Sequence, residues 1–228
     1  MGPAENCEQA TLAQHAVASR NTSPKAGLAA KNLIRREASI MAEKNLDTLF
    51  HDTLKDIYYA ERTILKALPK MARAAQSPEL KQAFEKHKEE TQGQVERLQQ
   101  VFELIGKRAQ GKTCPAIDGI VEEGEEIIAE YKGSAALDAG LIAAAQAVEH
   151  YEITRYGTLK RWAEVLEMAE AVTLLDATLQ EESMTDEALT GLADSAANQL
   201  AADAGSEDDE EGAAESKSSS KGKKKASA

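Results

Sequence analysis

Acidic and imidazole side chains interrupt the apolar stripes of four predicted helices. A helix buries residues three and four positions apart on one face. In the first long helix this spacing gives a stripe of Phe50, Leu54, Ile57, Glu61, Ile64 and Leu68. Glu61 therefore stands where an apolar core residue is expected.

The other three long helices repeat this feature near their midpoints. The second helix has His87 and Glu90, which are three residues and about 60° apart around the helix axis, so both can point to one place. The fourth helix has Glu149 and Glu152 on its buried side, and the fifth has Glu182. All four helices thus present at least one carboxylate to the predicted core.

Ionised carboxylates that converge in an apolar core repel one another, and burying them is costly unless they are paired or metal-bound. Two divalent metal ions are the simplest source of the missing positive charge. Di-iron bundles take one glutamate from each of two helices and a Glu-x-x-His pair from each of the other two. The predicted metal ligands here are Glu61, His87, Glu90, Glu149, Glu152 and Glu182.

The pattern departs from that arrangement in three ways. The second helix has the reversed order, His87-x-x-Glu90, the fourth has Glu149-x-x-Glu152, and the fifth has no histidine. His150 lies about 100° around the helix from Glu149 and should point elsewhere. A site richer in carboxylate than in imidazole favours iron or manganese over copper or zinc.

Each candidate ligand also has an ordinary structural explanation. A single glutamate on a helical stripe often lies at the boundary of the core and extends to water, and His87 can be a capping or surface residue. Glu181 can take the place of Glu182, with the other facing solvent. The agreement in phase among four helices is the argument for a metal site.

Five helices are expected between two tails, and no strand pattern occurs. Cap and stop residues place them at Glu43–Ala75, Ser77–Gly106, Pro115–Tyr131, Ser134–Glu167 and Ala169–Leu200, with Ser77 and Ser134 as N-caps. The predicted fold class is all-α: a ferritin-like four-helix bundle with an additional short crossover helix.

Composition divides the chain into three segments. Residues 1–42 are predicted to be a disordered N-terminal extension, with Met41 as an alternative start, and residues 43–202 to be the bundle domain. Residues 203–228 form an acidic and lysine-rich tail, also predicted to be disordered. The net charge of −12 disfavours nucleic-acid binding by the body and leaves only the lysine-rich tail as a weak candidate.

Cysteine usage and hydropathy indicate a cytoplasmic protein. Cys7 and Cys114 lie far apart and form neither a disulfide framework nor a zinc-binding pattern. There is no run of eighteen apolar residues, so no membrane span is predicted.

From about Asn45 to Leu200 the sequence resembles the bacterial YciE/YciF family of ferritin-like proteins. The resemblance is carried by LKDIYYAE at 54–61, FEKHKEETQGQVERL at 84–98, EEGEEI at 122–127, AAAQAVEHYEITRYGTL at 143–159 and LQEESMTDEA at 179–188. It implies a five-helix bundle that dimerises, a metal site inside the bundle and an association with bacterial stress responses. It also supports Glu61, Glu90, Glu149 and Glu152 as ligands.

Two functional hypotheses follow, and neither assigns catalytic residues. In the first, two iron or manganese ions act on peroxide or oxygen, or the protein handles iron. Tyr58, Tyr151 and Tyr156 then lie within about a turn of the ligands, where a tyrosine can donate a hydrogen bond or an electron, but packing in the core with a satisfied hydroxyl is the preferred explanation of them. In the second, the protein is a non-catalytic structural or interaction homodimer of the stress response without a functional metal.

The dimer has one further argument from the sequence. The short helix has an apolar face that needs cover, either from the bundle or from a partner subunit; it consists of Ile117, Ile120, Val121, Ile127 and Ile128.

Overall fold

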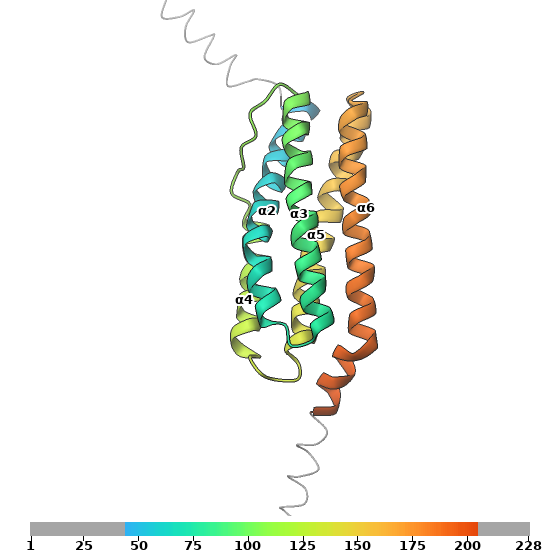
Figure 1. Cartoon of the computed structure of the whole chain (residues 1–228). Coiled ribbons are helices and arrows are strands. Elements are labelled where there is room, and N and C mark those ends of the chain that lie inside the picture. The colour runs from blue at the N-terminus through green and yellow to red at the C-terminus, as the bar shows by residue number, and fades with distance from the viewer. Residues whose placement is uncertain (1–43, 205–228) are drawn as a thin grey trace, which may run out of the picture. The chain divides into compact units, whose positions relative to one another are not determined.

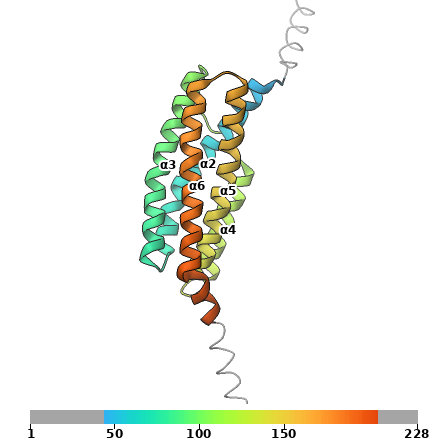
Figure 2. The ribbon, with the colours of Figure 1, turned by 90° about the vertical axis from the view of Figure 1, so that its right-hand side faces the viewer.

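The computed structural model describes residues 44–204, which form helices and loops without a strand. The long helices lie side by side, and a shorter helix packs against them (Figures 1 and 2). The long helices are α2 (Leu46–Ala74), α3 (Pro78–Leu104), α5 (Leu137–Val165) and α6 (Ala169–Leu192). The short helix, α4 (Pro115–Glu130), packs against α2 and α5. The prediction of an all-α bundle with an additional short helix is confirmed.

Side-chain caps set the starts of α2 and α3, and a glycine follows the end of α3. Helix α2 begins later than predicted because Asn45 accepts a hydrogen bond from the Thr48 amide at 3.0 Å. Ser77 caps α3 as predicted, since its hydroxyl oxygen accepts from the Leu80 amide at 3.0 Å. Helix α3 ends at Leu104, and Gly106 follows with a φ of 64°, a conformation that favours glycine.

The prediction that Ser134 caps α5 is wrong. Helix α5 begins at Leu137, and its N-cap residue, Ala136, makes no side-chain hydrogen bond. The Ser134 carbonyl instead accepts from the Gln76 side chain at 2.8 Å and from the Leu137 amide at 3.2 Å. These bonds hold Ser134 in the turn before the helix, so its hydroxyl is not placed at the helix terminus.

The last helix continues beyond Leu192, as predicted, but not as a regular α-helix. Residues Ala193–Ala197 form a π-helical turn, and helical structure resumes from 198 to 204. A single wide turn of this kind shifts the phase of the residues that follow it.

The apolar face of α4 is covered largely within the chain. Ile117 is completely buried, and the other four apolar residues of this face are partly buried against the core. Gly140 of α5 permits close packing, because a side-chain carbon at that position would lie 2.7 Å from Ile127 Cγ2. The α4 face therefore gives no reason to require a partner subunit.

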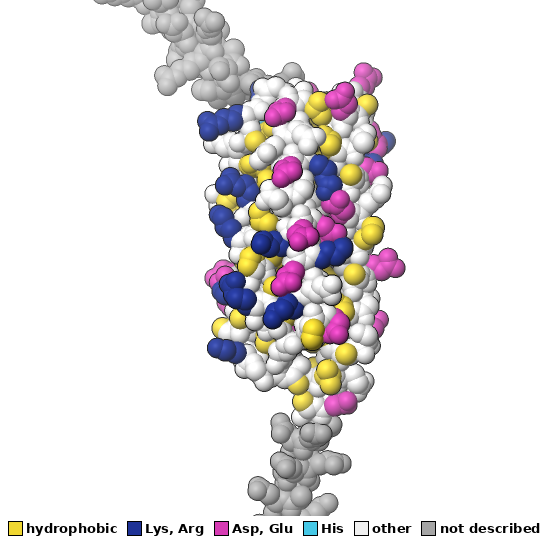
Figure 3. Space-filling view, in the orientation of Figure 1, with side chains coloured by type: hydrophobic (Ala, Val, Ile, Leu, Met, Phe, Trp, Pro, Cys, Tyr) yellow, Lys and Arg dark blue, Asp and Glu magenta, His cyan; other side chains and the backbone are white. Residues whose placement is uncertain are grey.

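Apart from a small group of polar side chains described below, the interior of the bundle is apolar. Large apolar residues fill the interior, including Phe50, Phe84, Phe102, Leu141 and Leu175. On the face shown in Figure 3, acidic and basic side chains intermingle and apolar patches are small. None of the helices within residues 44–204 is long and apolar enough to cross a membrane.

Asp138 ties the α2–α3 turn to the start of α5. Its Oδ1 accepts from the Gln76 amide at 2.8 Å and its Oδ2 from the Ser77 amide at 2.7 Å, and its side chain is largely buried. Asp138→Ala should lower the free energy of unfolding by about 1.5–3 kcal/mol, because two amides lose a charged acceptor. Urea denaturation measures this loss. Asp47→Ala, at an exposed first-turn position of α2, should change stability by less than about 0.5 kcal/mol.

Candidate metal centre

Five of the six predicted ligands are buried in the core. Glu61, Glu152 and Glu182 are completely inaccessible to solvent, Glu149 is 1% exposed and His87 is 4% exposed. They come from all four long helices. The helical phase of the stripes therefore predicted their burial correctly.

Four of these side chains converge. His87, Glu149, Glu152 and Glu182 each offer one potential ligand atom, and these four atoms all lie within 4.8 Å of one another. His87 Nε2 lies 3.3 Å from Glu149 Oε1, although neither ring nitrogen makes a hydrogen bond. The structure thus brings together ligands from three helices around one small volume.

Glu61 lies next to this group and extends it toward α2. The Tyr156 hydroxyl donates a hydrogen bond to Glu61 Oε1. The charge of Glu61 contributes to the raised pKa of Glu152, so these two carboxyl groups are near each other in the core. Glu61 is therefore connected to the four converging residues through Glu152, and its Oε2 is buried without a hydrogen-bond partner.

Glu90 lies at the edge of the cluster. Its Oε1 pairs with Lys86 Nζ at 2.6 Å and its side chain is 24% exposed. Its Oε2 is buried without a partner, and its charge contributes to the raised pKa of Glu149. The angular offset from His87 explains this position: His87 points into the core, while Glu90 lies on the flank of α3.

The alternative between Glu181 and Glu182 is resolved in the geometry. Glu181 accepts hydrogen bonds from both terminal nitrogens of Arg97, one at 2.9 Å, and from Gln94 Nε2 at 3.2 Å. Glu182 points into the core and is completely buried. Glu181, which pairs with Arg97, therefore lies on the outer side of α6, and Glu182 is the residue that faces the core.

Burial controls the protonation of the cluster. Desolvation raises the pKa of Glu61 to about 7 and that of Glu149 to about 8, and it raises the pKa values of Glu152 and Glu182 well above their usual range. Desolvation, followed by the nearby Lys86 charge, lowers the pKa of His87 to about 4. His87 is therefore neutral at pH 7 and retains a lone pair for a metal.

The donor set fits a divalent cation. Buried atoms without a hydrogen-bond partner include Glu61 Oε2, both His87 ring nitrogens, Glu149 Oε2, and both carboxylate oxygens of Glu152 and Glu182. Buried polar groups are normally satisfied, so such a concentration calls for an explanation. Carboxylates with a single imidazole suit a hard cation such as Fe(II) or Mn(II).

A second polar layer borders the cluster and was not assigned a role from the sequence. Thr91, Gln94 and Thr178 are fully buried. The Thr91 hydroxyl donates to the His87 carbonyl at 2.7 Å, while Gln94 Oε1 and Thr178 Oγ1 lack partners. The available signal was their place in the helical stripes, where they continue the polar interruption.

Only one of the three tyrosines near the ligands contacts a ligand. Tyr156 donates to Glu61, whereas the Tyr151 hydroxyl lies 3.1 Å from Cys114 Sγ. The Tyr58 hydroxyl accepts from Gln99 at 3.2 Å, and its ring packs edge-to-face on Phe102. Tyr58 and Tyr151 therefore have structural partners away from the cluster.

Comparison with known proteins places this helical unit in a family. The domain of unknown function DUF892 matches residues 45–202. Protein YciF from Escherichia coli strain K12 is 46% identical over 154 residues, which cover 67% of this chain and 93% of YciF. The chain belongs to the YciF family of DUF892 proteins. The resemblance identified from the sequence is thereby confirmed.

Solved structures support the same fold for this YciF family member. The E. coli stress protein YciF superposes with a TM-score of 0.64 at 46% identity, covering 66% of this chain and 95% of that chain. YcfI from Rhodopseudomonas palustris, described as a candidate structural protein, gives 0.64 at 46% identity, covering 66% and 96%. The protein XCC3681 from Xanthomonas campestris gives 0.51 at 25% identity, covering 64% and 89%.

The shifted pKa values predict that the metal-free protein loses stability between pH 6.5 and 8. The folded pKa values of Glu61 and Glu149 lie above the usual 4.5, so their stabilising protons are fully present below pH 4.5 and are lost through about pH 7 and 8. His87 has the opposite sign: its contribution is present above pH 6.5 and is lost as the pH falls toward 4. Above pH 6.5 the glutamates alone determine the direction.

Urea denaturation in the presence of a chelator tests this pH dependence. The free energy of unfolding should fall as the pH rises from 6.5 to 8. In a thermal melt, each kcal/mol of lost stability should lower Tm by about 2–4 °C. Glu149→Gln should reduce the slope, because glutamine does not titrate. A wild-type stability that is flat or rising over this window would show that the cluster holds no extra protons.

Proposed function

We propose that this YciF family member binds iron or manganese in the bundle core, with two ions held by the six predicted ligands. In this proposal it serves a stress response by handling iron or by acting on oxygen or peroxide. The observation that supports it best is the convergence of buried carboxylates without a basic side chain among them. The description of E. coli YciF as a stress protein agrees with this role.

Charge neutrality supports two ions in preference to one. Glu61, Glu149, Glu152 and Glu182 would carry four negative charges when ionised, and His87 is neutral. Two divalent cations would balance these four buried charges; the fifth carboxylate, Glu90, is partly exposed, so water can solvate its charge. One cation would leave two negative charges in an apolar core, and these would have to be removed by protons.

The two ion positions proposed here use different parts of the cluster. The group of His87, Glu149, Glu152 and Glu182 suits one ion. Glu61 would serve the second ion together with Glu152, and Glu90 would join at the His87 edge after leaving Lys86.

The side chains of the cluster would position the ligand atoms and release protons when metal binds. The hydrogen bond from Tyr156 fixes one oxygen of Glu61, and neutral His87 offers a nitrogen lone pair. Metal binding at pH 7 would release the protons that the raised glutamate pKa values retain. Bound ions of this kind supply Lewis-acid and one-electron redox chemistry.

A structural role without a functional metal is the second candidate. Here shared protons between Glu149 and Glu182, and between Glu61 and Glu152, would neutralise the core. The description of the R. palustris relative as a candidate structural protein favours it. A homodimer belongs to both proposals, and light scattering at micromolar concentration would test it.

Thermal unfolding with and without metal separates the two candidates. For the wild-type protein, Mn(II) or anaerobic Fe(II) at a hundredfold excess over Kd should stabilise the fold by about 2.7 kcal/mol. Glu182→Met should raise the stability of the metal-free protein, because it removes a desolvated carboxyl group, and it should abolish most of the metal-dependent shift. Elemental analysis of protein purified without chelator gives the number of ions bound.

A substitution elsewhere on α6 provides the control. Glu187 is exposed and lies outside the cluster, so Glu187→Met should retain the full metal-dependent shift. The metal proposal fails if the wild-type protein shows no shift with either ion. It also fails if Glu182→Met keeps the full shift, because the ion would then bind elsewhere.

A further inference from the structure

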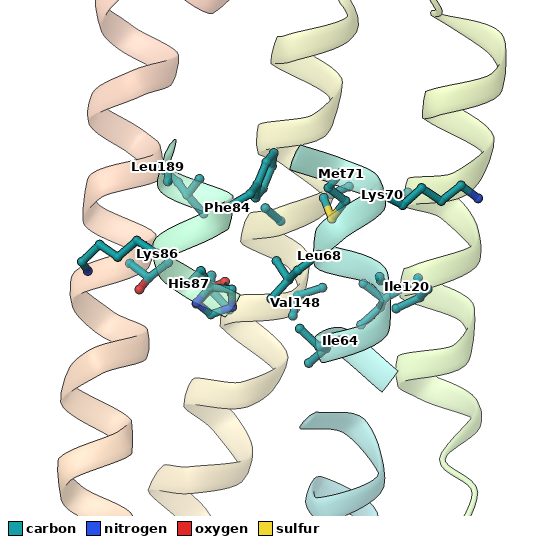
Figure 4. A pocket seen from close by; sticks show the side chains of 18 of the residues that line it. Ile64, Leu68, Lys70, Met71, Phe84, Lys86, His87, Ile120, Val148 and Leu189 are labelled. Atoms are coloured by element: carbon teal, nitrogen blue, oxygen red, sulfur yellow. Dashed lines mark ion pairs between the residues drawn. The ribbon is translucent and has the colours of Figure 1, made fainter. Parts of the chain in front are cut away.

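An apolar cavity adjoins one edge of the metal cluster. It is lined by residues of all five helices, α2 to α6, and reaches His87, Glu90 and Glu149. Figure 4 shows Leu68, Phe84 and Val148 around it, with the His87 ring at one end. The cavity is therefore continuous with the proposed metal site.

The cavity has apolar walls, charged residues where it reaches solvent and one polar group at its inner end. Its walls are mainly aliphatic and aromatic side chains, including Ile64, Ile120 and Leu189. Its charged lining residues form ion pairs where the walls reach solvent: Lys86 with Glu90, and Lys70 with Glu125 at 3.0 Å. The inner polar end is His87, which is buried and has no hydrogen-bond partner on either ring nitrogen.

Size and polarity restrict what can enter. The cavity has a volume of about 70 Å³, whereas an apolar cavity that holds benzene measures about 150 Å³. An occupant of two to a few heavy atoms therefore fits. An ion would lose its hydration without recovering it from the walls, and hydrogen peroxide would leave most of its hydrogen-bonding groups unsatisfied.

We infer that this cavity binds small, uncharged, apolar molecules, of which dioxygen is the physiological example, beside His87 and Glu149. The apolar walls offer water and hydrogen peroxide few hydrogen-bond partners, so dioxygen is favoured there over both. Delivery of dioxygen to a metal is the consequence, and only that consequence rests on the proposed function. Of the two oxidants named in the proposed function, dioxygen and peroxide, the inference selects dioxygen.

Dissolved dioxygen is paramagnetic, so it can be located in the metal-free protein by methyl NMR under oxygen pressure. The Ile64 methyl groups line the cavity, and those of Ile57, on the same helix and equally buried, do not. Ile64 and Val148 should show oxygen-dependent shifts that exceed those of Ile57 and Leu159. Equal shifts at all four residues would overturn the inference.

Filling the cavity provides the second readout. Ala67→Leu adds volume inside it from α2 and should remove the oxygen-dependent shifts, whereas Ala74→Leu, at a similarly half-buried position of α2 outside the lining, should leave them unchanged. Val148→Phe fills it from α5 should Ala67→Leu not fold. Retention of the Ile64 shift in a folded, filled variant would contradict the assignment.

Delivery to the metal is tested separately in iron-loaded protein. Two Fe(II) ions each give one electron to dioxygen, which takes up two solvent protons and leaves as hydrogen peroxide. Ala67→Leu should slow this oxidation relative to Ala74→Leu while keeping the Mn(II)-dependent melting shift. An unchanged rate in the filled variant would overturn delivery through the cavity. Failure of the wild-type protein to bind either iron or manganese would instead overturn the proposed function, and the methyl shifts of the metal-free protein would still decide the binding assignment.

Discussion

The free energy needed to bury four carboxylates in one apolar core constrains the rest of this structure. Glu61, Glu149, Glu152 and Glu182 are almost entirely removed from water. No lysine or arginine joins them within the converging group. Because an isolated buried carboxylate cannot stay ionised at reasonable cost, either protons or cations must neutralise the cluster. The raised pKa values correspond to neutralisation by protons, and the unpartnered oxygen and nitrogen atoms are compatible with neutralisation by cations.

The protein does use basic side chains to neutralise carboxylates, but only outside the core. Glu181 and Glu182 are adjacent on α6, about 100° apart around the axis, and have opposite environments. Glu181 binds Arg97, whereas Glu182 has no cation. Glu90 is likewise paired with Lys86 at the edge of the cluster. This sorting argues against random placement of the inner carboxylates, because α3 supplies Lys86 and Arg97 to the outer carboxylates and neither forms an ion pair with an inner one.

Local periodicity in the sequence was enough to predict which side chains are buried. Features that depend on how the helices pack against one another could not be predicted from it. Glu61 and Glu182 could be identified because a helical stripe fixes which side chains are buried. The weaker role of Glu90 depends on the rotation of α3 about its axis, which its own sequence does not determine. Ser134 has a good capping side chain, yet contacts with Gln76 hold it in a turn. The cavity could not be foreseen, since it requires five helices to leave space at one level of the bundle.

The position of that cavity bears on whether the cluster is structural or reactive. Structural metal sites are usually enclosed by protein ligands on all sides, whereas catalytic sites keep one position open. Most of this cluster is closed by packed side chains, with Tyr156 on Glu61 and Thr91, Gln94 and Thr178 next to it. The edge formed by His87 and Glu149 is different, because it lines the apolar cavity. Cavities in packed interiors are destabilising, so side chains that filled this space would make the fold more stable. An open edge beside the most polar part of the core therefore agrees with the proposal that the cluster is reactive.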